Sequence, residues 1–144
     1  MKVKLNCILL VDDDEPTNFL NRMTVEEVDC AQHVKVIPSA REALDYLQCS
    51  GRPSPLSRDC PKPEIIFLDI NMPAMDGWEF LEKYEAFPVD HKSSVIVIML
   101  TTSFNPEDEL KARQIPSVKE FRNKPLTHEA LEEILVKYFP NNCT

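Results

Sequence analysis

The chain has 144 residues, of which 43% are hydrophobic and 28% charged, and this composition fits a single globular domain spanning residues 1–144. The formal net charge of −8 argues against nucleic acid as a partner, because phosphate-binding surfaces need clustered lysine and arginine. No apolar stretch is long enough for a signal peptide or a membrane span. We therefore expect a cytoplasmic chain with no membrane partner and no output domain.

The cysteines are odd in number and lack CxxC or Cys/His metal spacing. Neither a disulfide framework nor a zinc site is indicated. We predict reduced thiols at all five positions: Cys7, Cys30, Cys49, Cys60 and Cys143.

Apolar segments of strand length alternate with amphipathic segments of helix length, which is typical of a parallel sheet covered by helices on both faces. We predict strands at residues 4–11, 34–37, 64–68, 95–100 and 118–121. The first, third and fourth should be central, and the short second and fifth, which carry Lys35 and Lys119, should lie at the edges. The predicted fold is α/β, a doubly wound (βα)5 sheet with strand order 2-1-3-4-5.

Helix start signals agree with this pattern. A capping box at Ser39 and Glu42, an N-cap at Asn105 followed by proline, and a cap at Thr127 predict three of the helices. The other two should begin near Pro16 and Gly77. We predict inward faces formed by Phe19, Leu20 and Met23; by Trp78, Leu81 and Tyr84; and by Leu131, Ile134, Leu135 and Tyr138.

A segment rich in proline and serine, residues 48–63, interrupts the pattern before the third strand. Such a composition does not hold a helix. We predict a surface loop insertion there.

Two adjacent carboxylates, Asp12 and Asp13, directly follow the first predicted strand. Side by side they repel each other unless a cation neutralises them, and Mg²⁺ is the natural cation for hard oxygen ligands. The alternative is that residues 12–14 only cap the first helix and complement its dipole.

A single aspartate, Asp69, ends the third strand, which should lie beside the first. A carboxylate there can act as metal ligand and as nucleophile, forming an aspartyl phosphate. The turn formed by residues 71–73 and 76–77 would direct its side chain, and the carbonyl of Asn71, into the cleft. Taken alone, Asp69 is equally well explained as a turn residue.

Thr101 ends the fourth strand and Lys124 follows the fifth. Alone, each is more simply a strand residue or a solvated surface residue. Together with the three aspartates, each stands at the carboxyl end of a strand, where an open parallel sheet binds its ligand.

This arrangement resembles the receiver domain of two-component response regulators, the CheY-like family, over essentially the whole chain. The resemblance implies that Asp69 is the phosphoacceptor. It also implies that Asp12, Asp13, Asp69 and the backbone carbonyl of Asn71 hold Mg²⁺, with Asp13 the more direct ligand of the acidic pair.

The same resemblance implies that Thr101 is the switch hydroxyl and that Phe121 changes rotamer on activation. Lys124 and Pro125 correspond to the family's lysine and its cis-prolyl neighbour. Such a domain is not an enzyme in the usual sense, although it catalyses its own phosphorylation and dephosphorylation.

The implied partners are a histidine kinase or phosphotransfer protein and a downstream protein that the sequence does not identify. The expected output face comprises the helix after Asn105, the strand 118–121 and the helix after Thr127, or else a homodimer carries the signal. The sequence departs from the family in its long loop, in Thr102 after the switch threonine, and in the turn at residues 115–117, which lacks glycine.

Three competing interpretations remain beside this one. A haloacid-dehalogenase-type phosphohydrolase would want a second aspartate where Asn71 stands, and an inert receiver-like interaction module would usually have lost Asp69, Thr101 or Lys124. Nucleotide-binding folds are disfavoured because no glycine-rich phosphate loop is present.

Overall fold

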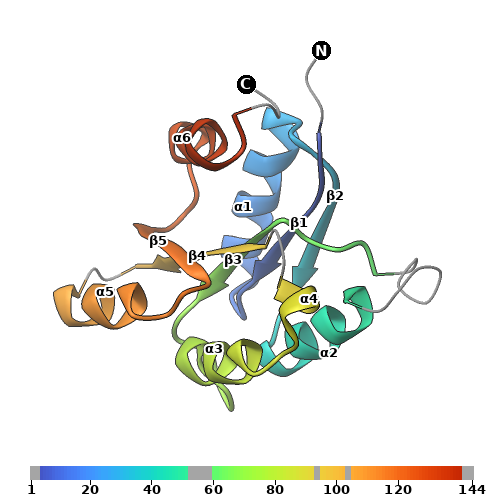
Figure 1. Cartoon of the computed structure of the whole chain (residues 1–144). Helices are drawn as coiled ribbons and strands as arrows, with labels where there is room; N and C mark the ends of the chain where they lie inside the picture. Colours follow the sequence, from blue (N-terminus) through green and yellow to red (C-terminus); the bar gives the residue numbers. More distant parts are fainter. Residues whose placement is uncertain (1–3, 52–59, 93–94, 103–104, 141–144) are drawn as a thin grey trace.

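The computed structural model describes residues 4–51, 60–92, 95–102 and 105–140, which form a parallel sheet with helices on both faces (Figure 1). The strands are β1 (Leu5–Val11), β2 (Ala31–Ile37), β3 (Ile65–Asp69), β4 (Ile96–Thr101) and β5 (Val118–Asn123). Their order is β2-β1-β3-β4-β5, and every neighbouring pair is parallel. The predicted fold class and strand order are confirmed.

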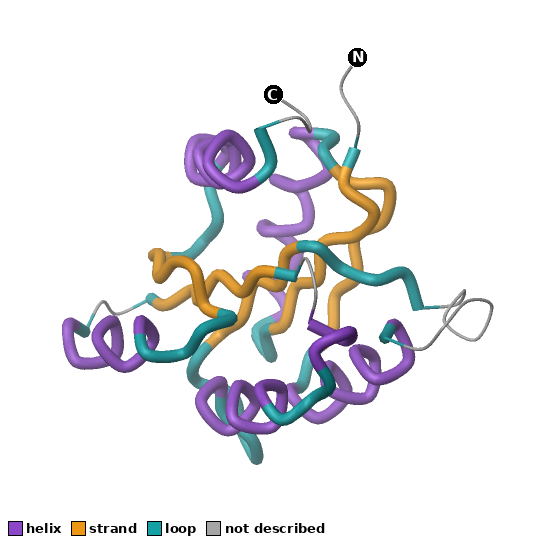
Figure 2. Tube along the Cα trace, in the orientation of Figure 1, coloured by secondary structure: helices purple, strands orange, loops and turns teal. Residues whose placement is uncertain are grey.

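The helices are α1 (Glu15–Val28), α2 (Ala40–Ser50), α3 (Gly77–Glu85), α4 (Val89–Lys92), α5 (Pro106–Arg113) and α6 (His128–Tyr138). Helices α1 and α6 cover one face of the sheet, and α2, α3 and α5 cover the other (Figures 1 and 2). The N-caps predicted at Ser39, Asn105 and Thr127 are all present, each accepting a backbone N–H of the first turn. The short helix α4 was not predicted. No helix within the described ranges has both the length and the apolar character needed to cross a membrane.

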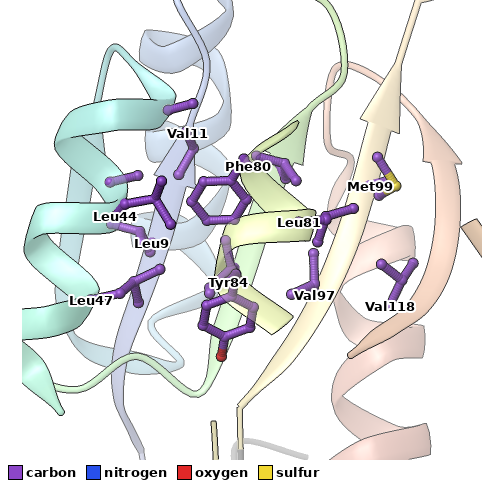
Figure 3. Close-up of a cluster of buried hydrophobic side chains, with 14 of the residues drawn as sticks. Leu9, Val11, Leu44, Leu47, Phe80, Leu81, Tyr84, Val97, Met99 and Val118 are labelled. Atoms are coloured by element: carbon purple, nitrogen blue, oxygen red, sulfur yellow. The ribbon is translucent and has the colours of Figure 1, made fainter. Parts of the chain in front are cut away.

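Two hydrophobic clusters flank the sheet, as expected when central strands are buried on both faces. On the face of α2 and α3, Leu47, Phe80 and Tyr84 pack over β1 and β4 (Figure 3). On the opposite face, α6 contributes the fully buried Leu131, Ile134 and Leu135. The predicted inward faces of α3 and α6 are therefore correct, although Trp78 and Tyr138 lie at their margins and are only partly buried.

The predicted inward face of α1 is wrong. Phe19, Leu20 and Met23 are 67%, 43% and 41% exposed, and the buried residues of the helix are Asn18, Asn21 and Val25. The helix turns this mostly polar stripe inward because its amides hydrogen-bond to backbone groups beneath it, as described below. The prediction rested on apolar periodicity alone, which favours the neighbouring stripe formed by Phe19, Leu20 and Met23.

The predicted loop and the predicted thiols also need correction. Helix α2 continues to Ser50, so residues 48–50 are helical, and residues 52–59 lie outside the described part of the chain. Cys49 and Cys60 form a disulfide, with Cα atoms 6.0 Å apart. The end of α2 and the approach to β3 meet in space, which the sequence separation of 11 residues did not reveal. Cys7 and Cys30 are buried thiols, and Cys143 falls outside the described residues.

Candidate functional site

Polar side chains collect at the carboxyl edge of the sheet. Asp12 follows β1, Asp69 and Thr101 are the last residues of β3 and β4, and Lys124 follows β5. The register pairs Asp69 with Leu100, the residue just before Thr101, so the strand ends lie level with one another. Parallel pairing thus brings groups from the whole length of the sequence to one edge.

Lys124 lies at the centre of this group. Its Nζ donates to Asp12 Oδ2 at 2.9 Å and to Asp69 Oδ1 at 3.0 Å, and all three side chains are nearly buried. Its backbone N–H donates to the carbonyl of Thr101 at 2.8 Å, and the peptide bond to Pro125 is cis. The lysine is therefore fixed at its backbone and aimed at two carboxylates.

The charges in this group influence one another strongly. Burial raises the pKa of Asp69, the hydrogen bond from Lys124 opposes this effect, the charge of Asp12 adds to it, and the net direction is upward. Burial alone would lower the pKa of Lys124, but hydrogen bonds to Asp12 and Asp69 outweigh it and the pKa is raised. The ammonium therefore stays charged at neutral pH and compensates the buried carboxylates.

The carboxylates of Asp12, Asp13 and Asp69 present oxygen atoms within 4.8 Å of one another. Asp12 and Asp69 are buried and Asp13 is exposed. Three converging hard oxygen donors, one of them open to solvent, fit the preference of Mg²⁺ for carboxylates together with water. The capping alternative applies to Asp14, which is the N-cap of α1 and accepts the Thr17 N–H at 3.0 Å.

Two asparagines of α1, which the sequence analysis did not identify, support this edge. Asn18 Nδ2 donates to the carbonyl of Asp12 at 2.7 Å, and Asn21 Oδ1 accepts the backbone N–H of Leu126 at 2.8 Å. Thr24 Oγ1 donates to the carbonyl of Leu126 at 3.2 Å. One helix thus holds the loops after β1 and β5. The spacing of the asparagines, three residues apart with Val25 on the same face, was the signal available in the sequence.

The turn after β3 fixes the backbone beside Asp69. Asn71 N–H approaches Asp69 Oδ1 at 3.4 Å, and Gly77 N–H donates to the carbonyl of Ile70 at 2.7 Å. A Cβ at Gly77 would lie 2.8 Å from the carbonyl oxygen of Asp69. Only glycine permits this close approach, so the first residue of α3 sets the position of the aspartate loop.

Thr101 is 3% exposed, so its hydroxyl lies within the edge of the sheet. Phe121 of β5 is half-buried against the cluster under α2 and α3. It lines a groove of about 230 Å³ with Ala112 of α5, Val118 of β5 and Lys137 of α6. The two residues expected to act as a switch therefore lie on adjacent strands, and the second borders the surface of α5, β5 and α6.

Comparisons with known proteins agree with this architecture. Residues 8–136 match the family described as "Response regulator receiver domain". The chain is 29% identical over 108 residues to the response regulator Rcp1 of Synechocystis, covering 75% of this chain and 69% of that protein. A crystal structure of a two component response regulator from Cytophaga hutchinsonii superposes with a TM-score of 0.80 at 31% identity, covering 96% and 99% of the two chains. A response regulator receiver protein from Dyadobacter fermentans gives a TM-score of 0.78 at 25% identity, with 92% and 97% covered.

Proposed function

Since the chain belongs to the response regulator receiver domain family of two-component systems, we propose that it accepts a phosphoryl group on Asp69 from a histidine kinase or a phosphotransfer protein. The observation that carries this proposal is the bridge from Lys124 to Asp12 and Asp69, because it holds a nucleophilic carboxylate beside a cation in a nearly buried cleft. Such donors draw phosphate from ATP, so we place the chain in the cytoplasm.

In the proposed reaction, a carboxylate oxygen of Asp69 attacks the phosphorus of a phosphohistidine. The O–P bond forms and the N–P bond breaks, and the imidazole nitrogen keeps the electron pair and takes a proton. Asp69 must be ionised to attack. Lys124 favours that form by hydrogen bonding, against the burial that raises the pKa of Asp69. Its ammonium is also placed to bind an oxygen of the phosphoryl group.

Asp12, Asp13 and Asp69, with the backbone carbonyl of Asn71, are the proposed ligands of Mg²⁺. Bound there, Mg²⁺ would neutralise the carboxylates and the charge of the transferring phosphoryl group. Asp12 is held for this role by the N–H of Asp14, which donates to its Oδ1 at 2.9 Å.

We assign Thr101 and Phe121 to signal output. A phosphoryl group on Asp69 would draw the Thr101 hydroxyl toward it by a charge-assisted hydrogen bond, and the Phe121 ring would fill the space left behind. A downstream protein, or a second copy of the chain, would then bind the face of α5, β5 and α6. Phosphorylation can shift the equilibrium between the two states of this face only by the difference in their affinity for the phosphoryl group.

The phosphoacceptor assignment is tested by incubating the chain with acetyl phosphate and Mg²⁺ and measuring the intact mass. We expect one added phosphoryl group, lost in Asp69→Asn and in EDTA, and retained in the matched control Asp45→Asn on the exposed surface of α2. A phosphoryl adduct that persists in Asp69→Asn would refute the assignment.

The output assignment is tested by amide chemical shifts with Mg²⁺ and beryllofluoride, which mimics an acyl phosphate. Shift changes should extend from Asp69 through Thr101 to Phe121 and α6. Changes confined to the loops around Asp12, Asp69 and Lys124 would exclude this route while leaving the phosphorylation chemistry intact.

A further inference from the structure

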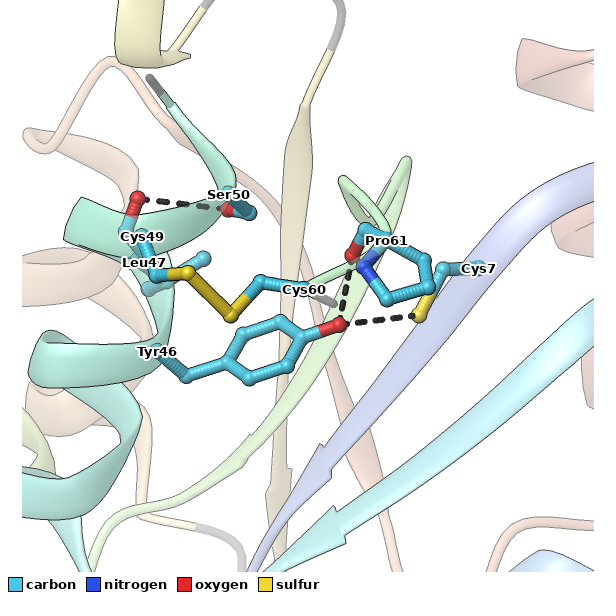
Figure 4. Close-up of a disulfide and its surroundings, with 7 residues drawn as sticks. All are labelled: Cys7, Tyr46, Leu47, Cys49, Ser50, Cys60 and Pro61. Atoms are coloured by element: carbon cyan, nitrogen blue, oxygen red, sulfur yellow. Dashed lines mark hydrogen bonds between the residues drawn. A yellow bond between two sulfur atoms is a disulfide. The ribbon is translucent and has the colours of Figure 1, made fainter. Parts of the chain in front are cut away.

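The disulfide between Cys49 and Cys60 joins the last turn of α2 to the segment that leads into β3 (Figure 4). The Cα separation of 6.0 Å is ordinary for a disulfide, and both cysteines are partly exposed. Helix α2 ends and β3 begins at the amino edge of the sheet, opposite the edge that carries Asp69. The bond is therefore reachable from solvent and separate from the proposed phosphorylation site.

Contacts that involve no sulfur atom hold both sides of this junction. On the helix side, Gly51 N–H donates to the carbonyl of Leu47 at 3.1 Å. On the strand side, the Tyr46 hydroxyl donates to the carbonyl of Pro61 at 2.5 Å (Figure 4). Opening the disulfide would leave these hydrogen bonds in place. The two thiols would then stay close together, so the bond could form again without refolding.

The nearby thiol of Cys7 is protected from exchange. It is fully buried, and burial raises its pKa to about 11, so very little thiolate is present at neutral pH. The Tyr46 hydroxyl lies 3.8 Å from its Sγ and between it and Pro61 (Figure 4). Cys30 is also fully buried. Thiol–disulfide exchange needs an accessible sulfur. Among the four cysteines in the described part of the chain, only Cys49 and Cys60 offer one.

We propose that Cys49 and Cys60 form a reversible redox site that is reduced by a dithiol of the thioredoxin class. This inference goes beyond the proposed phosphorylation and takes from it only the cytoplasmic location, where disulfides are usually transient or redox-sensing. A thiolate of the reductant attacks one Sγ, the S–S bond breaks, and the other cysteine leaves as a thiolate and takes a proton. The second reductant thiol then displaces the first cysteine, so two electrons and two protons pass to the chain and the reductant becomes a disulfide.

The redox state of Cys49 and Cys60 should affect the surroundings of His91 in α4. Gly51, two residues after Cys49, lies so close to His91 that a Cβ there would be 2.0 Å from the imidazole Cδ2. The His91 ring in turn packs edge-on against Phe87, with ring centroids 5.9 Å apart. The turn that carries the redox site therefore also supports α4. Reduction should shift the ring resonances of His91.

The test is a redox titration of the full chain carrying Cys143→Ser, in buffers of reduced and oxidised glutathione. Thiols are trapped by alkylation and located by peptide mass spectrometry. Cys49 and Cys60 should gain and lose the label together across these buffers, while Cys7 and Cys30 remain unlabelled. The melting temperature should fall by roughly 5–10 °C on reduction. The disulfide closes a loop with a sequence separation of 11 residues, and opening it removes this constraint from the unfolded chain.

The matched control is the double variant Cys49→Ser/Cys60→Ser, whose melting temperature and His91 resonances should not respond to reductant. Two results would overturn the proposal: a bond that reductant opens only after the chain is unfolded, or thiols that take up glutathione separately and never pair. Phosphorylation by acetyl phosphate is measured in both redox states and should be unchanged. If phosphorylation fails in both redox states, that result contradicts the assignment of Asp69 as phosphoacceptor and leaves the proposal for the cysteines unaffected.

Discussion

Replacing Asp69 by asparagine should stabilise the folded chain near neutral pH. Asp69 is 4% exposed, and burial and the charge of Asp12 together outweigh the hydrogen bond from Lys124, so its pKa is raised. Asparagine has nearly the same shape and keeps an oxygen that can accept from Lys124 Nζ. The substitution therefore removes a costly charge and retains the contact.

The size of the effect follows from the distances. With an effective dielectric constant near 20, Lys124 at 3.0 Å attracts Asp69 by about 5.5 kcal/mol, and Asp12, with a carboxylate oxygen within 4.8 Å, repels it by at least about 3.5 kcal/mol. Asp13 is exposed, and water screening reduces its repulsion to about 1 kcal/mol. These terms nearly cancel, so the several kcal/mol needed to desolvate a carboxylate decide the sign. Because the amide is also partly desolvated, we expect Asp69→Asn to gain about 1–3 kcal/mol.

The gain should depend on pH in one direction. The folded-state pKa of Asp69 lies above the ordinary value of 3.8, so ionised Asp69 destabilises the fold above its raised pKa. That penalty disappears as the pH falls through the raised pKa toward the ordinary value, because the carboxyl group is then protonated in both states. The difference between the parent chain and Asp69→Asn should therefore shrink in acid.

Urea unfolding monitored by the single tryptophan, Trp78, measures this difference in EDTA at neutral and at acid pH. The control is Asp45→Asn, whose exposed carboxylate should change the free energy of unfolding by less than about 0.5 kcal/mol. An asparagine variant that is no more stable than the parent at neutral pH, or whose advantage does not vary with pH, would refute the electrostatic explanation.

Three further substitutions test other parts of the structure. Lys124→Met should slow phosphorylation by acetyl phosphate about tenfold or more, as expected when one charged contact to the phosphoryl group is lost, whereas the exposed Lys83→Met should not. Asn21→Ala should lower the free energy of unfolding by about 1–3 kcal/mol in urea, because the buried N–H of Leu126 loses its acceptor. Tyr84→Phe should be neutral or stabilising by up to about 1 kcal/mol by the same measurement, because the Tyr84 hydroxyl is buried without a hydrogen-bond partner among the described residues; a clear loss of stability would contradict this.

The strand order and the meeting of Asp12, Asp69 and Lys124 could be predicted because both depend on patterns that the sequence carries directly. Continuous apolar runs mark the central strands, and parallel pairing brings all their carboxyl ends to one edge. The roles of these residues in phosphorylation remain predictions, since they rest on chemistry that the arrangement permits.

The features that sequence reasoning missed depend on tertiary contacts. Helix α1 buries Asn18 and Asn21 because backbone groups of the loops after β1 and β5 need hydrogen-bond partners, and hydrophobic periodicity does not register that need. The bond between Cys49 and Cys60 depends on where α2 ends relative to β3. Helix α4 has only four residues, too few for a periodic signal.

The anchoring of the Lys124 loop by α1 also bears on how the chain is made. Lys124 reaches Asp12 across 112 positions of sequence, and Leu126 reaches Asn21 across 105. Contacts of such separation close late in folding, because the loop entropy must be overcome first. During synthesis, the ribosome must release the chain at least as far as Lys124 before the lysine can meet Asp12 and Asp69. A copy that ends before β5 would keep Asp12 and Asp69 but lack Lys124, so the two carboxylates would face each other without their counter-ion.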